Sequence, residues 1–341
     1  MVAHDAAGVL RRLAFAPDAE TFTRAAASVD DWSALLRLAR PQGLAGVLYH
    51  RAKDAGVALP ERARAEGEER DLGDAIWFEH LELSLAEQSR ALSAAGVRAV
   101  VLKGPPLARR VYDPPHARVA MDLDWLVAPG ALAAAMEALA PLGYRRLGTG
   151  EAAEAREHHH VHLTHASSPP VELHFHAHEG FGRPVPAGPL VERARVRGAG
   201  TTLELEPVDE LVYLATHAAG HAFSRASWLL DVALLLRQRD APPLASVLSR
   251  ARALGASRAV RLALAELSEL DPSLAAGVRA PRLPRAILAL ERAGRLPAVA
   301  RNVALRAALA DDPARAAFHV VRKVLRDGPL AVSALLRRVR P

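Results

Sequence analysis

Two aspartates separated by one residue, Asp122 and Asp124, form the pattern with the clearest chemical meaning. They fall in a short apolar run that is typical of a strand. Alternation along a strand would put both carboxylates on one face, with Leu123 and Trp125 on the other. Two adjacent carboxylates repel each other and lose solvation there. A divalent cation relieves both penalties, because Mg²⁺ prefers carboxylate oxygens and keeps positions for water and phosphate.

Further residues could complete a phosphoryl-transfer site. Glu172 lies in another apolar run, and three acids on adjacent strands can hold two metal ions that align an attacking and a leaving oxygen. Lys103 and Gly104 follow a predicted strand and precede a predicted helix, where backbone amides and a lysine suit phosphate. Each piece also has an ordinary explanation: a loop Asp-x-Asp, a surface lysine, an acid facing solvent. Their combination on these elements favours the metal site.

Histidines are concentrated near the third acid. Eight of the 15 lie between residues 158 and 178, and those at 158, 160 and 162 would share one strand face, as would those at 174, 176 and 178. A zinc or other transition-metal site is one interpretation. The favoured one is that His174 positions substrate or the third acid, or packs in the core. The eight are His158, His159, His160, His162, His165, His174, His176 and His178.

Arg118 and two helical pairs complete the candidates. Arg118 precedes Asp122 by four residues, and its planar fork could pair with the acids or with a triphosphate. Trp228 and Asp231 share one helix face, which favours an anchor between the C-terminal helices and the core. His217 and His221 also share a helix face, and packing or hydrogen bonding is their simplest interpretation.

Hydrophobic periodicity predicts the elements that position these residues. A helix over 60–95 carries an apolar stripe of Leu72, Ile76, Leu83, Leu85 and Leu92. The pattern predicts helices over 30–51, 60–95, 105–112, 131–142 and 208–239 and through most of the chain after 244, and strands over 97–102, 123–127, 144–147, 158–164 and 171–176. This layout predicts three parts: an N-terminal helical region over 1–96, an α/β core over 97–206 and a C-terminal helical region over 207–341.

Composition excludes several classes of protein. The 341 residues contain no cysteine, which rules out disulfide scaffolds, cysteine nucleophiles and thiolate metal sites. Half of the chain is hydrophobic, which argues against overall disorder. No long uncharged apolar run predicts a membrane span, and the first twelve residues lack the pattern of a signal peptide. We therefore expect a cytoplasmic protein with no membrane partner.

The positive charge is concentrated near the C-terminus. The net charge is +6, but residues 251–341 hold 17 Lys and Arg against 7 Asp and Glu, while the other residues hold 27 against 31. A basic surface can bind RNA, whereas a solvated helix face is the simpler interpretation. Arginine far exceeds lysine, as a GC-rich genome favours, since Lys53, Lys103 and Lys323 are the only lysines.

These motifs resemble a known family. The run Leu102-Lys103-Gly104, then Tyr112, Arg118 and Asp122-Leu123-Asp124-Trp125-Leu126-Val127, is similar to the bacterial "uncharacterised nucleotidyltransferase" family, part of the DNA polymerase beta-like superfamily. The resemblance extends over about residues 30–240. It also includes Trp32, Gly43, Gly143-Tyr144, Val171-Glu172-Leu173-His174-Phe175, Pro207, Asp209, His217, Trp228, Leu229 and Asp231.

The resemblance implies an α+β fold, in which a mixed-sheet nucleotidyltransferase core is flanked by N- and C-terminal helical regions. It also implies Asp122 and Asp124 as metal ligands, Glu172 as the third acid, and Lys103-Gly104 as the phosphate-side turn. The chain departs from the wider superfamily at two points. Lys103-Gly104 replaces Gly-Ser, a change shared by the narrower family, and the third acid is Glu where Asp is common.

The hypothesis is therefore a metal-dependent nucleotidyltransferase. It would use Mg²⁺ or Mn²⁺, as two ions, to move a nucleotidyl group from an NTP such as ATP to a hydroxyl or phosphate acceptor, releasing pyrophosphate. The acceptor stays open among a small molecule, a peptide and an RNA bound by the basic C-terminal helices. Two alternatives remain: a non-catalytic nucleotide- or nucleic-acid-binding protein with a degenerate core, and a transferase that tailors natural products or polysaccharides.

Overall fold

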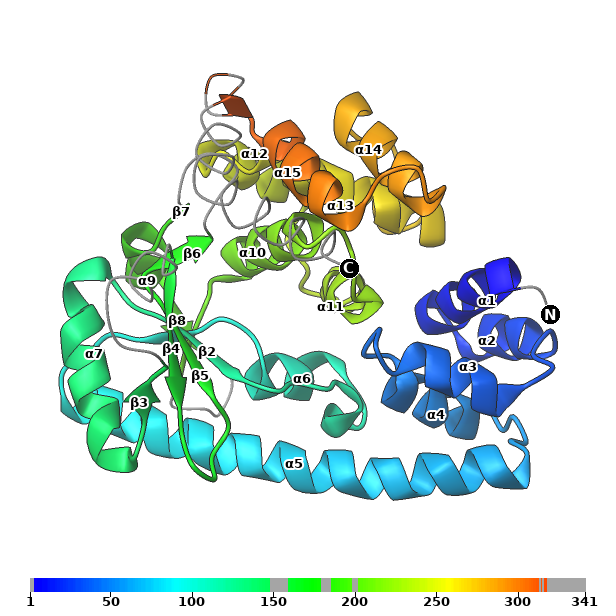
Figure 1. Ribbon diagram of the computed structural model, residues 1–341, viewed down its shortest axis with the longest axis horizontal. Helices are drawn as coiled ribbons and strands as arrows, with labels where there is room; N and C mark the ends of the chain where they lie inside the picture. The colour runs from blue at the N-terminus through cyan, green and yellow to red at the C-terminus, as the bar shows by residue number, and fades with distance from the viewer. Residues whose placement is uncertain are drawn as a thin grey trace, which may run out of the picture.

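A mixed seven-stranded sheet lies among helices from both ends of the chain (Figure 1). This computed structural model describes residues 3–147, 159–178, 185–197, 202–312, 314, 316 and 317. The predicted α+β class, a nucleotidyltransferase-like mixed sheet flanked by helices, is confirmed. No helix in the described ranges is long and apolar enough to cross a membrane.

The helices form three groups around the sheet (Figure 1). The first contains α1 (Ala3–Phe15), α2 (Ala19–Ala26), α3 (Trp32–Ala39), α4 (Ala45–Asp54) and the long α5 (Glu61–Ala94). The second lies within the α/β part and contains α6 (Pro105–Val111), α7 (Leu132–Leu139), α9 (Gly188–Arg193) and the 3-10 turns η1 (Pro115–Ala117), η2 (Pro129–Ala131) and η3 (Ala140–Leu142). The third contains α10 (Pro207–Gly220), α11 (Ala226–Leu236), α12 (Leu244–Ala253), α13 (Ser257–Leu270), α14 (Arg282–Arg292) and α15 (Ala298–Leu309).

The sheet has the order β3-β4-β5-β2-β1-β9-β8. Its strands β2 and β5 pair in parallel, as do β1 and β9, and the other neighbours are antiparallel. The strands are β1 (Val100–Val101), β2 (Leu123–Leu126), β3 (Arg145–Arg146), β4 (His160–Thr164), β5 (Val171–His174), β8 (Arg195–Val196) and β9 (Leu203–Glu204). A separate pair is formed by β6 (His176–His178) and β7 (Val185–Pro186).

One face of the sheet is apolar and packs against α5 and α7. Leu123 and Trp125 of β2 and Leu173 of β5 are buried there with residues of both helices. The Trp125 indole donates a 2.7 Å hydrogen bond to Gln88 of α5, so the one polar group of this side chain is satisfied inside the core. Because side chains alternate along a strand, the residues between these positions must point to the opposite face.

The remaining helices share a second core. Buried residues of α1 to α4 form a continuous cluster with buried residues of α10, α11 and α13, and Val100, Leu102 and Leu126 join it from the other face of the sheet. The described parts of the first and third predicted regions therefore pack together. The division into ranges 1–96, 97–206 and 207–341 stays a prediction.

Two predicted helices are each divided into two. The expected helix over 30–51 is interrupted after α3, where Gly43 has a φ of +69°. The expected helix over 208–239 ends with α10 and begins again with α11, because Ala222 and Phe223 both have a φ of 54°, which a helix cannot continue through.

The predicted strand over 171–176 is shorter than expected. At its end the amides of Phe175 and His176 both donate to the carbonyl of His159, and the chain then leaves the large sheet. His174 therefore belongs to β5, whereas His176 and His178 belong to β6 in the smaller sheet. The single face expected for these three histidines is wrong, because one strand does not carry them all.

The apolar stripe predicted for 60–95 is only partly buried. Leu85 and Leu92 face the sheet as expected, but Leu72, Ile76 and Leu83 are 65%, 64% and 73% exposed. The face of α5 that meets its neighbours changes along its 34 residues, since its first half packs on α4 and η1 and its second half on the sheet. A single stripe cannot describe such a helix.

Candidate active site

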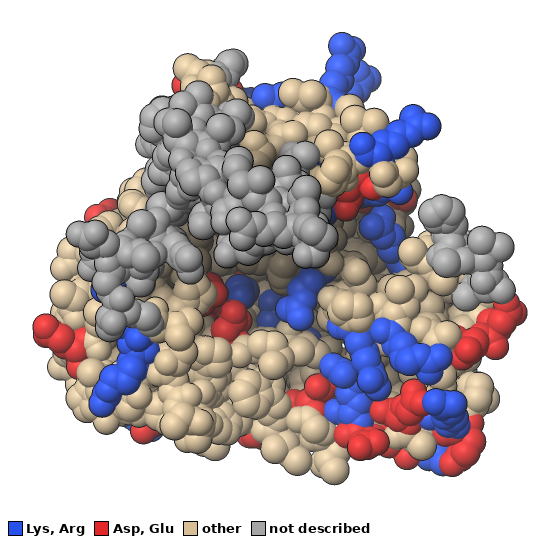
Figure 2. Space-filling view, in the orientation of Figure 1, with Lys and Arg blue, Asp and Glu red and all other residues tan. Residues whose placement is uncertain are grey.

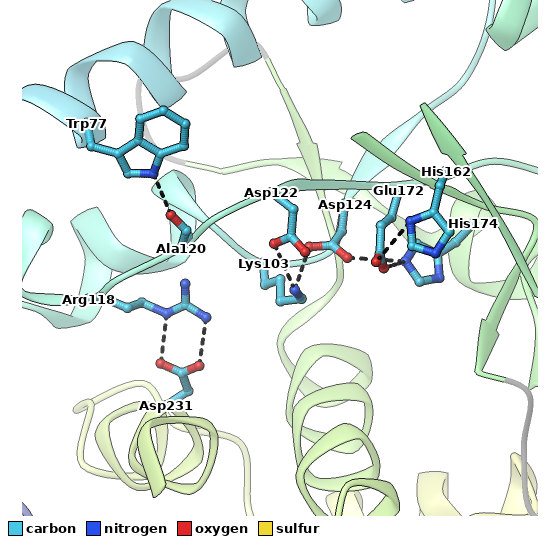
Figure 3. Close-up of polar contacts among 10 residues, drawn as sticks. All are labelled: Trp77, Lys103, Arg118, Ala120, Asp122, Asp124, His162, Glu172, His174 and Asp231. Carbon is cyan, nitrogen blue, oxygen red and sulfur yellow. Dashed lines mark hydrogen bonds and ion pairs between the residues drawn. The ribbon is translucent and has the colours of Figure 1, made fainter. Parts of the chain in front are cut away.

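The polar face of the sheet brings the three predicted acids together (Figure 3). Asp124 is the second residue of β2, and Asp122 immediately precedes this strand. In the parallel pairing of β2 with β5, Asp124 lies opposite Glu172, and Leu126 lies opposite His174. The acids expected on adjacent strands are therefore neighbours, although Asp122 lies just before its strand and not within it.

Lys103 lies between the two aspartates. Its Nζ is 2.7 Å from Asp124 Oδ2 and 3.4 Å from Asp122 Oδ1. The amide of Leu102 donates a 3.0 Å hydrogen bond to the Asp124 carbonyl, which fixes the chain just before the lysine. Burial lowers the pKa of Lys103, but the charges of Asp124 and Asp122 outweigh it, so this pKa is raised overall and the ammonium stays charged.

Gly104 makes the turn from β1 into α6. Its φ of +91° is one that a residue with a side chain rarely adopts, so glycine is required at this position. The helix that follows begins with Pro105 and Pro106, neither of which has an N–H. The start of this helix therefore offers fewer amides to a phosphate than a typical helix start, and Lys103 is the main positive group of the turn.

His174 bridges two of the acids. Its Nε2 lies 3.2 Å from Asp124 Oδ1 and 3.3 Å from Glu172 Oε2. Burial lowers the pKa of His174, but hydrogen bonds to Asp124 and Glu172 outweigh it and raise this pKa overall. The structure thus gives His174 the position beside the third acid that the sequence indicated.

The carboxylates have different electrostatic environments. Burial and the charge of Asp124 raise the pKa of Asp122. Burial also opposes ionisation of Asp124, whose side chain is 2% exposed, but Lys103 and His174 outweigh it and lower its pKa. Burial likewise opposes ionisation of Glu172, and the hydrogen bond with His174 lowers its pKa overall. His162 Nδ1 also lies 3.5 Å from Glu172 Oε1, so three carboxylates face one ammonium and two imidazoles.

These groups line a cavity of about 440 Å³. Figure 2 shows a hollow near the middle of the molecular surface, with both acidic and basic side chains in it. The wall formed by the sheet carries the three acids with Lys103, and the opposite wall comes from α10 and α11. A cavity of this size can contain a small ligand.

The helical wall is aromatic. Tyr213, His217 and His221 follow one another at four-residue spacing near the cavity, and the ring of Trp228 lies 4.8 Å from that of His217. The guanidinium carbon of Arg225 lies 5.9 Å from the centre of the Trp228 ring. The sequence indicated packing or hydrogen bonding for His217 and His221. Their spacing continues back to Tyr213, and this longer pattern is the signal that could have indicated a wall facing a ligand.

Arg118 pairs with a different acid from those expected for it. Its Nε and Nη2 lie 2.9 and 2.8 Å from the two carboxylate oxygens of Asp231, as a bidentate pair (Figure 3). Tyr112 also donates a 2.6 Å hydrogen bond to Asp231. Asp231 thus anchors α11 to the segment that leads to Asp122, as its spacing with Trp228 predicted. Arg118 borders the cavity, but the acid that it pairs with is Asp231.

A row of imidazoles continues from the acids along β4. His160 Nδ1 is 2.8 Å from His159 Nε2, and His160 Nε2 is 2.8 Å from His162 Nε2. Burial lowers the pKa of His159 to about 2 and that of His160 to about 4, so both rings are neutral near pH 7. His165 accepts amide hydrogen bonds in a loop instead, and His158 lies outside the described residues.

The donor set fits a divalent cation. Ligand atoms of Asp124, Glu172 and His174 all lie within 4.8 Å of one another, and Asp122 approaches the same ammonium as Asp124. Carboxylate oxygens are the usual ligands of Mg²⁺ and Mn²⁺. Imidazoles nearby, in the groups His159–His160–His174 and His160–His162–Glu172, add nitrogen donors that suit transition metals better than Mg²⁺.

Comparison with known families agrees with this geometry. A family model described as "Uncharacterised nucleotidyltransferase" matches residues 28–270, which include the sheet and both walls of the cavity. The chain belongs to this family. The match extends beyond the range of about 30–240 over which the motifs carry the resemblance. Neither the curated proteins nor the solved structures gave a match to this nucleotidyltransferase-family chain.

Proposed function

We propose that this protein is a metal-dependent nucleotidyltransferase that moves a nucleotidyl group from an NTP to a hydroxyl or phosphate acceptor. The observation that carries the proposal is the convergence of Asp122, Asp124 and Glu172, with Lys103, on one wall of a cavity. Membership of a nucleotidyltransferase family supports the same reaction class. Excess carboxylate in a cavity is unfavourable without a cation, so the arrangement suits metal-bound triphosphate.

Asp122, Asp124 and Glu172 would hold Mg²⁺ or Mn²⁺, as two ions. Bound there, the cations would neutralise charge that develops on the phosphates. His174 contacts Asp124 and Glu172 at the same time, so it fixes the spacing between carboxylates of two strands. We therefore assign His174 a positioning role.

The remaining residues would bind the nucleotide and manage the proton. Lys103 and the Gly104 amide would hold phosphate oxygens, and Glu172 would orient the acceptor hydroxyl and take its proton. The acceptor oxygen forms a bond to the α-phosphorus, the bond from that phosphorus to the bridging oxygen breaks, and pyrophosphate leaves with the electron pair. Each of these residues lines the cavity.

The helical wall would contact the nucleoside or the acceptor. The Trp228 ring offers an aromatic surface, and Arg225 lies over it within cation–π distance. Nucleic-acid bases stack on such surfaces with little sequence preference. Arg118 would position the site through Asp231, because its paired nitrogens are already committed to that carboxylate.

Pyrophosphate release tests the proposal. Purified protein is incubated with each of the four NTPs, with Mg²⁺ or Mn²⁺, and with RNA, a peptide mixture or a small-molecule extract as acceptor. We expect release with at least one combination and none after chelation with EDTA. Binding of an NTP without turnover in any combination would instead support the non-catalytic alternative. Salt-sensitive stimulation by RNA would identify a nucleic-acid acceptor, and stimulation by the small-molecule extract would favour a tailoring enzyme.

A further inference from the structure

A second cluster of metal-ligating side chains lies outside the cavity. It consists of His50 on α4, Asp71 on α5 and His116 on η1. The three residues do not border the cavity described above. They lie far apart in the sequence and belong to no local motif, so spacing alone does not reveal them. The fold brings them together where the first half of α5 meets α4 and η1.

The geometry of the cluster is that of a small metal site. Both imidazoles direct Nε2 at the same oxygen, Asp71 Oδ1, at 2.5 Å from His50 and 2.8 Å from His116. The three ligand atoms all lie within 4.8 Å of one another, and the two rings meet edge to face at 5.4 Å. Imidazole nitrogen and carboxylate oxygen are common zinc donors, and such a site needs no cysteine.

The surroundings combine rigidity with access to solvent. The side chain of His50 is 9% exposed, while those of His116 and Asp71 are 19% and 29% exposed. A cation bound by these three ligands could therefore keep a water molecule as its fourth. One turn along α5, Asp74 pairs with Arg70 at 3.2 Å.

The cluster fastens the segment that leads to the acids. After His116, the backbone of Ala117 packs so closely on α4 that a side chain at Gly46 would come within 3.1 Å of it. Further along, Trp77 of α5 donates a 2.7 Å hydrogen bond to the carbonyl of Ala120. Two residues after Ala120 along the chain, Asp122 contacts Lys103. A metal ion shared by His116 and residues of α4 and α5 would therefore fix the start of the segment that runs from His116 to Asp122.

We propose that His50, Asp71 and His116 bind one zinc ion, which joins η1 to α4 and α5 and stabilises this part of the fold. The competing explanation is a hydrogen-bonded cluster, in which two imidazoles donate to one carboxylate oxygen without any metal. The two explanations differ in one measurable property, the number of zinc ions held at this place. The cavity histidines can also bind zinc, so the experiment must separate the two locations.

Zinc content of matched variants makes this separation. The full-length wild type, H50A/H116A and the control pair H160A/H162A are stripped with a chelator, reloaded with zinc, passed through a desalting column and measured by mass spectrometry. We expect H50A/H116A to hold one zinc ion fewer than the wild type, and H160A/H162A to keep that ion. Competition with a zinc-binding dye should show that H50A/H116A has lost the tight site, with affinity weakened roughly 100-fold or more.

Thermal unfolding gives a second readout that needs no catalytic activity. Zinc should raise the melting temperature of the wild type and of H160A/H162A, but not that of H50A/H116A. If the double variant does not fold, Asp71→Asn replaces it, because the amide preserves the shape and hydrogen bonding of the carboxylate but is a weaker ligand. Equal zinc content and affinity in the wild type and in the His50, His116 or Asp71 variants would overturn the proposal, as would a wild type that holds no zinc.

Discussion

Two clusters of charged side chains lie at the same cavity, and they differ in the balance of positive and negative charge. Arg118 and Asp231 form a one-to-one bidentate pair in which the charges match. The acid cluster instead sets three carboxylates, those of Asp122, Asp124 and Glu172, against one ammonium and two imidazoles. A buried pair whose charges balance needs no further ion, so its role is to hold elements of the fold together. An unmatched cluster is costly unless a cation joins it, which is how a binding site differs from an anchor.

Breaking the matched pair should have the largest effect. Asp231→Asn leaves the Arg118 guanidinium buried without a counter-charge, and we expect the free energy of unfolding to fall by about 3–5 kcal/mol. Urea denaturation measures this change. The double variant R118M/D231L, which removes both charges, should regain most of the loss. A decrease below about 1 kcal/mol for Asp231→Asn would show that the pair is not an anchor.

Removing a charge from the unmatched cluster should affect activity more than folding. We expect Asp122→Asn to lower the rate of nucleotidyl transfer by about 10²–10³-fold, because electrostatic stabilisation of the phosphates is lost. Initial rates with saturating NTP and Mg²⁺ measure this effect. The matched control is Asp113→Asn, which changes a charge in the same segment but outside the cavity lining. Equal rates for wild type and Asp122→Asn would show that this carboxylate is not part of the active site.

The cation within the unmatched cluster should have an intermediate effect. Lys103→Met removes a charged contact to the phosphates, and we expect NTP binding to weaken by about 10- to 100-fold. Lys103→Arg keeps the charge with a different shape and should recover part of the affinity. Equilibrium binding of a non-hydrolysable NTP analogue measures the affinities of both variants and of the wild type. Unchanged affinity in Lys103→Met would place the phosphates elsewhere in the cavity.

The smallest effect concerns stability and its dependence on pH. Because burial and Asp124 raise the pKa of Asp122, its charge opposes folding at neutral pH without metal. Asp122→Asn should therefore be more stable than the wild type at pH 7, in EDTA. This gain should disappear as the pH falls through the raised pKa, since Asp122 is then neutral in the wild type. A gain that persists at low pH would have another cause.

The local part of the site could be predicted from the sequence. Alternation on β2 placed Asp122 and Asp124 on the face opposite Leu123 and Trp125, and Glu172 does lie on the adjacent strand. The family and the fold class are confirmed. These features depend on residues close together in the chain or on one recognisable set of motifs. They can therefore be inferred from periodicity and spacing.

Contacts between distant elements could not be predicted in this way. The partner of Arg118 is Asp231, and nothing in the local sequence distinguishes this acid from the three on the sheet. The cluster of His50, Asp71 and His116 likewise exists only after three elements pack together. The interruption between α10 and α11 has no such local signal, because the positive φ angles there belong to Ala222 and Phe223 and not to glycines.

Transfer of a labelled α-phosphate is the most direct test of the central claim, that the unmatched acid cluster performs metal-dependent nucleotidyl transfer. NTP labelled at the α-phosphorus is incubated with acceptor and Mg²⁺, using the wild type and the double variant D122N/D124N. The wild type should move the label to the acceptor and release unlabelled pyrophosphate, and the double variant should do neither. Label transfer at equal rates by both proteins would contradict the account.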